Sequence, residues 1–265
     1  MNDRLAAEVS HWEQQVQQPR RMLFRRNWYK KINARLSERM IESLGDLRGR
    51  RVLFVGCGGS TTTARKMAEL GGEIWCLDIS AASLEQFQKS SFGELAPKIH
   101  PVQGDAEDMP FEKGFFDVVV GKAIVHHLDI RRFLDQLRRV CAPQARIVFC
   151  EPLGFNPLIN LFRRLTPRIR TRTERPLTRK DIQAFRRRCR WLRLDYHECL
   201  ATAAYPVYIS GLVGLGDLAH RVLCFLDRLL FAVLPPARWL AWCVMIVGRL
   251  NNETGASGAT GSPSC

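Results

Sequence analysis

Glycines follow an apolar run near the start of this chain, in a pattern that can bring the backbone close to a ligand. Residues 51–60 read Arg-Val-Leu-Phe-Val-Gly-Cys-Gly-Gly-Ser, and a helix-forming segment, residues 61–70, follows at once. A buried strand, a glycine turn and a helix start together are typical of nucleotide-binding α/β proteins. We therefore expect Gly56 and Gly58 to lie beside a ligand at a helix N-terminus. Simple chain punctuation is the alternative reading.

Two acids follow the next two apolar segments. Glu73–Asp78 reads as a second strand that ends in an acid, and an acid about 20 residues after such a turn can accept hydrogen bonds from both ribose hydroxyls of a nucleoside. Ile99–Gln103 reads as a third strand and leads into Asp105. The alternatives are a strand-ending turn residue for Asp78 and a helix cap for Asp105.

Three residues are candidates for proton transfer. His126 and His127 come after a fourth apolar segment, residues 115–120, and Glu151 ends a fifth, residues 145–150. A histidine pair that titrates near neutrality is suited to removing a proton from a phenol or an enol. The alternatives are a structural cap for the histidines and pairing with nearby arginines for Glu151.

The order of these motifs over residues 47–152 resembles the class I S-adenosylmethionine-dependent methyltransferases, and most closely the group that includes the quinone C-methyltransferases. The resemblance implies a Rossmann-like α/β fold with a mostly parallel sheet of seven strands and helices on both faces. Residues 191–199 suit its sixth strand, and Cys243–Leu250 suits its antiparallel last strand.

The resemblance also implies S-adenosylmethionine as the cofactor, and it assigns roles to residues. Gly56 and Gly58 would lie beside the methionine portion of the cofactor. The other positions matched to cofactor binding are Asp78 for the ribose, Ile79 for the adenine face, Asp105 with Ala106 for the adenine amine, and Lys122 near the sulfonium.

Two residues depart from the family pattern. Phe54 stands where the family has an acid that helps to hold the cofactor's ammonium group, and Ser60 replaces the third glycine. Serine is a good N-cap, and we expect its hydroxyl to accept a helix N–H bond. The two changes predict weakened or rearranged cofactor binding, and they leave a catalytically degenerate relative open.

Composition limits the remaining possibilities. The 265 residues are 46% hydrophobic, enough for one sizeable core. No pair among the nine cysteines has Cys-x-x-Cys spacing, so we expect reduced thiols in a cytoplasmic protein and no metal site. Residues 1–4 carry an acid and no apolar run follows, so we expect no signal peptide.

The net charge of +14 favours an anionic partner, either nucleic acid or a membrane surface. Three features favour the membrane: the nearly uncharged residues 205–216, the helically spaced apolar residues 222–234, and Trp239 and Trp242 on either side of Arg238. No charge-free apolar stretch reaches the roughly 18–20 residues of a membrane span. We expect peripheral association with an anionic surface at the inner face of the membrane. Packing of these segments on the core is the alternative.

The chain divides into an N-terminal helical cap, residues 1–46, a methyltransferase domain, residues 47–250, and a disordered tail, residues 251–265. Within the domain, residues 154–180 are expected to cap the substrate, and residues 205–238 to form a hydrophobic insertion before the last strand.

These features favour methyl transfer to a lipophilic, membrane-borne acceptor: a quinone precursor, a lipid or a lipid-linked intermediate. Methyltransferases that modify nucleobase amines carry an Asn/Asp-Pro-Pro-aromatic segment after the fourth strand. Residues 121–127 read Gly-Lys-Ala-Ile-Val-His-His instead, so we do not expect a nucleic-acid substrate. A soluble methyltransferase for a small molecule or RNA remains the alternative enzyme.

Overall fold

The computed structural model describes residues 3–17, 27–166 and 174–251. The helices are α1 (Asp3–Gln17), α2 (Asn27–Glu42), α3 (Thr61–Glu69), α4 (Ala81–Gln88), α5 (Ile130–Val140), α6 (Pro157–Leu165), α7 (Arg179–Arg188), α8 (Tyr205–Ile209) and α9 (Val213–Val233). The strands are β1 (Arg51–Val55), β2 (Glu73–Asp78), β3 (Ile99–Gln103), β4 (Phe116–Lys122), β5 (Cys141–Pro152), β6 (Cys189–His197) and β7 (Cys243–Leu250).

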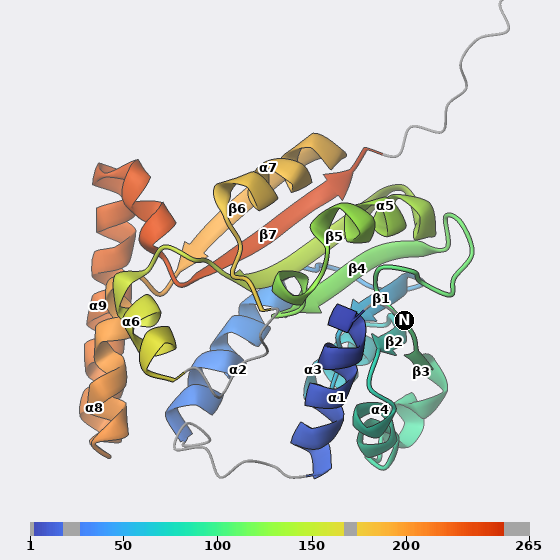
Figure 1. The fold of residues 1–265 in the computed structure, drawn as a ribbon, viewed down its shortest axis with the longest axis horizontal. Coiled ribbons are helices and arrows are strands. Elements are labelled where there is room, and N and C mark those ends of the chain that lie inside the picture. Colours follow the sequence, from blue (N-terminus) through green and yellow to red (C-terminus); the bar gives the residue numbers. More distant parts are fainter. Residues whose placement is uncertain (1–2, 18–26, 167–173, 252–265) are drawn as a thin grey trace, which may run out of the picture.

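The strands form one seven-stranded sheet in the order β3-β2-β1-β4-β5-β7-β6 (Figure 1). Strands β1 to β5 are parallel, and β7 runs antiparallel between β5 and β6. The predicted Rossmann-like fold is therefore confirmed. The strand order reverses between β1 and β4, and α/β proteins bind ligands at the carboxyl ends of the strands beside such a reversal.

Helices cover both faces of the sheet, which explains why the central strands are apolar throughout. Helices α2, α3 and α4 pack on one face, and α5 and α7 pack on the other. The caps predict the helix starts well: Ser80 Oγ accepts a bond of 3.1 Å from Ser83 N at α4, and Asp129 caps α5.

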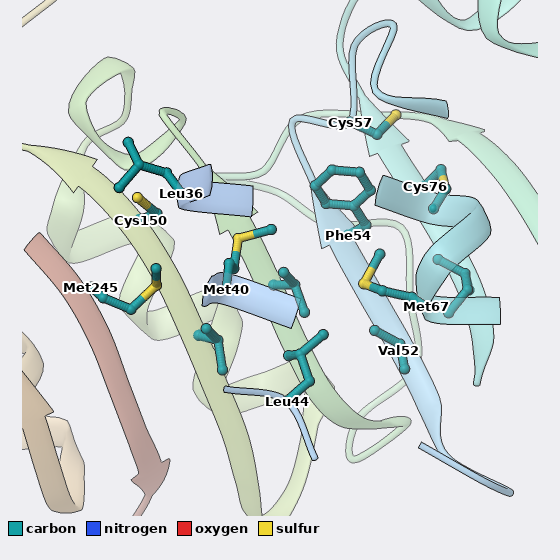
Figure 2. Close-up of a cluster of buried hydrophobic side chains, with 14 of the residues drawn as sticks. Leu36, Met40, Leu44, Val52, Phe54, Cys57, Met67, Cys76, Cys150 and Met245 are labelled. Carbon is teal, nitrogen blue, oxygen red and sulfur yellow. The ribbon is translucent and has the colours of Figure 1, made fainter. Parts of the chain in front are cut away.

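Phe54 belongs to the core under α2 and α3. Figure 2 shows its ring among Met67, Val52 and the thiols of Cys57 and Cys76. The side chain that replaces the family's acid is thus buried among apolar groups. The eight cysteines of the described residues are free thiols, as expected.

Three strands differ from their predicted bounds. Strand β4 spans Phe116–Lys122 instead of residues 115–120, β5 spans Cys141–Pro152 instead of residues 145–150, and β6 runs two residues earlier than residues 191–199. Pro143 and Gln144 read as a turn, and Gln144 does have φ +61, but the strand continues across it with a register shift between Phe116 and Val118 of β4. This register shift depends on the pairing of β5 with β4, so the sequence of β5 alone does not predict it.

The described residues show which helices the terminal and inserted segments contain, and the division of the chain into these units stays a prediction. Helices α1 and α2 come from residues 1–46, and α8 and α9 come from the insertion before β7. Most of the predicted tail, residues 252–265, and residues 167–173 of the predicted substrate cap lie outside the described residues. Among the described helices, none combines the length and the apolar character that a membrane span requires.

Candidate functional site

The glycine turn after β1 is held against the end of β2. Gly56 N and Cys57 N both donate to Leu77 O, at 2.8 and 3.3 Å. Gly56 has φ +64, and a Cβ atom there would lie 2.7 Å from Ile124 Cγ1. The turn therefore needs glycine both for its backbone conformation and for its close approach to the loop after β4.

Asp78 fastens this turn to β2. Its Oδ2 accepts a 2.7 Å bond from Gly58 N, and its Oδ1 accepts a 3.0 Å bond from Ser80 N. Burial raises the pKa of the Asp78 carboxyl, and the bonds from Ser80 and Gly58 oppose that rise. A carboxylate can accept about four hydrogen bonds, so these backbone bonds leave capacity for a ligand hydroxyl. The turn role and the ribose role are thus compatible.

Asp105 lies at the same edge of the sheet, because Asp78 pairs with Gln103 at the end of β3. Its Oδ1 accepts a 2.8 Å bond from Glu107 N, which closes a turn rather than a helix. Ala106 is buried, and Ile79, which follows β2, is half-buried. The structure therefore gathers Gly58, Asp78 and Asp105 at the carboxyl ends of adjacent strands.

Ser60 stands at the N-cap of α3, but its hydroxyl makes no cap hydrogen bond, so that expectation is wrong. Its φ and ψ of −80° and 54° are not the extended conformation that turns a cap side chain towards the first helical turn. Its carbonyl oxygen serves instead, accepting bonds of 3.2 and 3.3 Å from Thr63 N and Ala64 N.

His126 and Glu151 form a buried pair at the carboxyl ends of β4 and β5. Glu151 Oε2 lies 2.8 Å from His126 Nδ1, and Oε1 accepts bonds of 2.9 and 3.0 Å from Ile124 N and Val125 N. Glu151 is fully buried, and its partners are these groups, so the arginine alternative is wrong. A carboxylate on Nδ1 fixes the proton there and leaves Nε2 as the basic nitrogen.

His127 lies beside His126, with ring centroids 4.2 Å apart. Its Nδ1 is 3.4 Å from Glu8 Oε1, and the Trp12 ring meets it edge-on. A ring nitrogen of each histidine and a carboxylate oxygen of Glu174 all lie within 4.8 Å of one another. Sequence reasoning missed Glu8, Trp12 and Glu174, because their sequence positions carry no signal of contact with residues so far away.

Lys122 joins the end of β4 to helix α2. Its Nζ donates to Asn33 O at 2.7 Å and to Ser37 Oγ at 2.9 Å, and burial lowers the pKa of its ammonium group. The ammonium is thus engaged by the N-terminal helical segment. Its contact with the cofactor stays a prediction.

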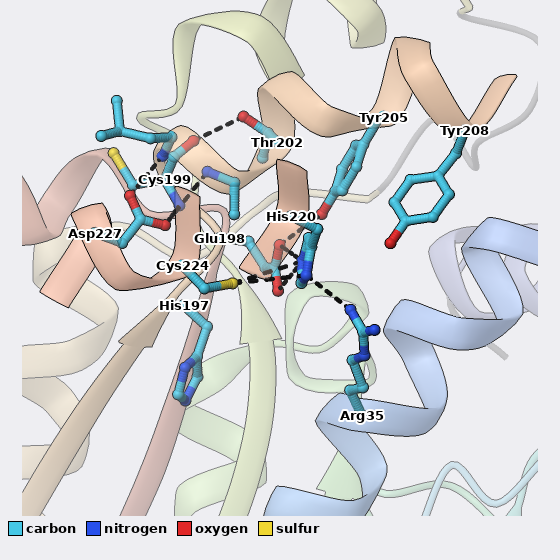
Figure 3. Close-up of polar contacts among 12 residues, drawn as sticks. Arg35, His197, Glu198, Cys199, Thr202, Tyr205, Tyr208, His220, Cys224 and Asp227 are labelled. Atoms are coloured by element: carbon cyan, nitrogen blue, oxygen red, sulfur yellow. Dashed lines mark hydrogen bonds and ion pairs between the residues drawn. The ribbon is translucent and has the colours of Figure 1, made fainter. Parts of the chain in front are cut away.

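The insertion is fastened to the rest of the fold by buried polar groups, which Figure 3 draws. Glu198 Oε2 lies 2.9 Å from His220 Nε2 of α9, and Arg35 Nη1 of α2 lies 2.7 Å from His220 Nδ1. Asp227 of α9 accepts a 2.7 Å bond from Leu200 N and a 3.0 Å bond from Cys199 N. Polar groups therefore occupy the inward face of α9.

The outward face of α9 is apolar. The buried residues of the helix are Gly216, His220, Asp227 and Phe231. On the opposite side, large apolar side chains face solvent at helical spacing. These exposed side chains are Val213, Leu215, Leu218, Val222, Phe225, Leu226, Leu229 and Val233, and we call them the α9 stripe. Phe231 on the inward face also packs in the core, so α9 has apolar side chains on both faces instead of a single apolar stripe towards the core.

Trp239 and Trp242 do not form the exposed pair expected at a headgroup boundary. The Trp239 ring lies 5.0 Å from the Arg179 guanidinium and packs on Tyr196, and Trp242 packs on Tyr205. Both tryptophans are half-buried within the fold. The rings pack against neighbouring aromatic residues of the fold, and their place at a membrane surface stays a prediction.

Comparisons with known proteins agree with the fold. Residues 53–149 match the family model described as "Methyltransferase domain". The chain is 32% identical over 134 residues to a demethylmenaquinone methyltransferase of Lactococcus lactis, covering 46% of this chain and 53% of that protein. It is 29% identical over 129 residues to the O-methyltransferase cnsE of Penicillium expansum, covering 48% and 46%.

A solved structure extends the likeness to the whole fold. Geranyl diphosphate C-methyltransferase from Streptomyces coelicolor has a TM-score of 0.63 at 10% identity, covering 94% of this chain and 98% of that one. At this identity the likeness concerns the fold alone. The chain spans about half the length of the curated relatives named above.

Proposed function

We propose that this chain is a class I S-adenosylmethionine-dependent methyltransferase, and that it transfers a methyl group from S-adenosylmethionine to a lipophilic, membrane-borne acceptor. The acceptor class is a quinone precursor, a lipid or a lipid-linked intermediate. The single observation that carries the acceptor class is the α9 stripe, an apolar surface on the insertion.

The cofactor residues follow from the edge of the sheet described above. We assign the glycine turn at Gly56 and Gly58 to the methionine portion of the cofactor, and Asp78 to the ribose hydroxyls. Asp105 lies at the end of the neighbouring strand, where it is suited to the adenine amine. The buried Ala106 and the half-buried Ile79 supply apolar surface for the base.

The chemistry is a direct displacement at the sulfonium methyl group. The acceptor atom attacks the methyl carbon, the carbon–sulfur bond breaks, and S-adenosylhomocysteine leaves. A phenol or enol acceptor must lose its proton to become a good nucleophile. We assign this ionisation to His126 and His127, with Glu151 as the residue that positions His126 through Nδ1.

The α9 stripe supports a membrane-borne acceptor. Monomeric soluble proteins rarely leave large contiguous apolar patches in water, and such patches mark interaction surfaces. Exposed Arg221 and Arg228 of the same helix, and a chain charge of +14, suit an anionic lipid surface. We propose that the protein lies on the inner face of the membrane, reached from the cytoplasm.

One relative named above has a name that specifies an acceptor of this kind. The Lactococcus lactis protein is named for demethylmenaquinone, a quinone precursor. This similarity supports the acceptor class and leaves the acceptor atom open to assay.

Vesicle flotation tests the membrane proposal. The wild type is expected to float with anionic vesicles, and a much smaller fraction of the double variant Phe225→Gln, Leu229→Gln is expected to float with them. Leu70→Gln is the matched control, because it removes an exposed leucine outside the insertion. Wild-type protein that stays at the bottom at low salt would contradict the proposal, as would a double variant that floats like the wild type.

A transfer assay tests the activity. Labelled methyl groups from S-adenosylmethionine should enter the lipid extract of anionic vesicles that contain a demethylated quinone. Labelling of only water-soluble acceptors or RNA would instead favour a soluble methyltransferase.

The buried Phe54 favours one other candidate, a degenerate relative that binds S-adenosylmethionine without transferring its methyl group. Saturable cofactor binding with no methyl transfer to any of these acceptors would identify that case.

A further inference from the structure

We propose that His126, His127 and Glu174 bind a divalent transition-metal ion, with Zn²⁺ the first to test, at the acceptor end of the site. Its catalytic consequence rests on the proposed function, whereas its binding can be measured independently. The cluster combines two imidazoles and one carboxylate, a set that suits zinc and neighbouring transition metals and leaves coordination positions for a substrate.

The geometry of the cluster is close to that of a metal site. One ligand atom from each of the three residues lies within 4.8 Å of the other two, and both histidines are buried. Ligand atoms around a tetrahedral zinc ion are about 3.3 Å apart, given bonds of about 2.0 Å. Glu174 is half-buried whereas both histidines are buried, and binding of an ion would require the three ligand atoms to draw closer together.

Each histidine has a carboxylate near its Nδ1 atom, and metal sites use such carboxylates in their outer shell. A histidine ligand almost always gives its other ring N–H to a carboxylate or carbonyl, which fixes the tautomer and raises the basicity of the ligating nitrogen. Glu151 Oε2 lies 2.8 Å from His126 Nδ1, and Glu8 Oε1 lies 3.4 Å from His127 Nδ1. On this basis we assign Nε2 of each ring to the metal.

A second cluster has suitable residue types but unsuitable geometry. Glu198, His220 and Cys224 also bring ligand atoms within 4.8 Å of one another. There, Glu198 occupies His220 Nε2, and the Arg35 guanidinium donates to Nδ1 at 2.7 Å (Figure 3). Both ring nitrogens are thus engaged, and a cation already lies against the histidine. The polar cluster at His220 serves to dock α9.

The ion would supply the ionisation step assigned above to the histidines. A hydroxyl or enol oxygen of the acceptor binds the metal as a further ligand, which lowers its pKa, and its proton passes to solvent water. The oxyanion then attacks the methyl carbon, a carbon–oxygen or carbon–carbon bond forms, and the carbon–sulfur bond breaks. With the ion bound, the metal would keep its oxidation state, and His126 and His127 would promote the ionisation as metal ligands instead of accepting the proton themselves.

Metal binding by the full chain tests the inference. After treatment with a chelator, the protein is titrated with Co²⁺ and the visible absorption bands of the bound ion are followed, and Zn²⁺ is measured by competition. One ion per chain is expected. In Glu174→Gln the affinity for the ion should fall about tenfold or more, the scale of effects seen at metal sites.

Two control variants and one further ligand variant complete the test. Cys224→Ser removes a ligand of the second cluster, and His100→Ala removes an exposed histidine paired with Glu73, so both should bind the ion like the wild type. His127→Gln should weaken binding as Glu174→Gln does, with circular dichroism to establish that it is folded. Equal binding by the wild type and Glu174→Gln, or loss of binding in Cys224→Ser, would overturn the inference.

The same preparations separate this inference from the proposed function. The metal-free protein should still bind S-adenosylmethionine, because the cofactor residues are distinct from the metal ligands. Methyl transfer that is unaffected by the chelator would overturn the metal step and leave the methyltransferase proposal standing. Loss of cofactor binding in untreated protein would overturn the proposed function alone.

Discussion

Asp78 shows how one side chain can build a turn and receive a ligand. Its carboxylate fixes Gly58 N–H at 2.7 Å and begins the loop that ends β2. Bonds from ribose hydroxyls to the same oxygens would be charge-assisted, and such bonds contribute about 1.5–3 kcal/mol each. The site therefore depends strongly on the charge at this position.

Asp78→Asn should weaken S-adenosylmethionine binding about ten- to a hundredfold, since each lost charge-assisted bond is worth about 1.5–3 kcal/mol. Equilibrium dialysis with labelled cofactor measures the affinity. Asp108→Asn, an exposed acid near the same edge, is the control and should bind normally. Equal affinities in the two variants would contradict the ribose role.

The affinity should also fall towards acid pH earlier than for an ordinary aspartate site. Burial raises the pKa of Asp78, so its carboxylate takes up a proton at a higher pH than usual and then loses acceptor capacity. Equilibrium dialysis across a pH series measures the cofactor affinity at each pH. In Asp78→Asn the fall should disappear, and a fall that persists there would assign it to another group.

Glu151→Gln should destabilise the fold by about 2–4 kcal/mol, because a buried carboxylate that accepts several bonds would be replaced by an amide with a misplaced donor. The relevant bonds come from Ile124 N, Val125 N and the His126 ring. Urea unfolding measures the loss, with the exposed Glu112→Gln as the matched control. A loss no greater than that of the control would contradict this account of Glu151.

At the scale of elements, the glycine turn after β1 is defined by its neighbours as much as by its own conformation. Gly56 and Gly49 both have positive φ, at +64 and +67. A Cβ atom at Gly56 would meet Ile124, whereas at Gly49 nothing lies within 4 Å. Comparing substitutions at Gly49 and Gly56 therefore separates the cost of backbone strain from the cost of a steric clash.

Gly49→Ala should cost about 1–2 kcal/mol, the strain of a left-handed alanine. Gly56→Ala should cost more, because the added methyl group also displaces the Ile124 side chain, and it should weaken cofactor binding as the turn moves. Thermal unfolding and dialysis measure the two effects. Equal stability losses would show that Ile124 moves aside freely.

Most elements were predictable because their signals are local. Strands β2, β3 and β7 have the expected bounds, since apolar runs and turn residues delimit them. The inward face of α9 was not predictable, because the choice of which side of a helix meets the core depends on distant partners such as Glu198 and Arg35. For the same reason, the sequence did not predict that Glu8 and Glu174 lie near His126 and His127.

At the scale of the whole molecule, charge and apolar surface act together. The chain carries a net +14, and α9 presents a stripe of apolar side chains to solvent. Electrostatic attraction to anionic lipids is screened over about 10 Å at 0.1 M salt, whereas apolar insertion is not weakened by salt. The two contributions can therefore be separated.

Raising salt should reduce the fraction of wild-type protein that floats with anionic vesicles, without abolishing it. The double variant Phe225→Gln, Leu229→Gln should keep only a weak, fully salt-sensitive association. Flotation over a salt series measures both. Wild-type binding that vanishes at high salt would mean that the stripe does not enter the bilayer, and a salt-resistant stoichiometric dimer in its place would identify a second copy as the partner.

The central claim is that an adenosine-bearing sulfonium cofactor sits over the glycine turn between Asp78 and Asp105. Isothermal titration calorimetry of S-adenosylmethionine into the full chain tests it most directly. We predict saturable binding of one cofactor per chain. The absence of any binding at millimolar cofactor, with the protein folded, would contradict the account.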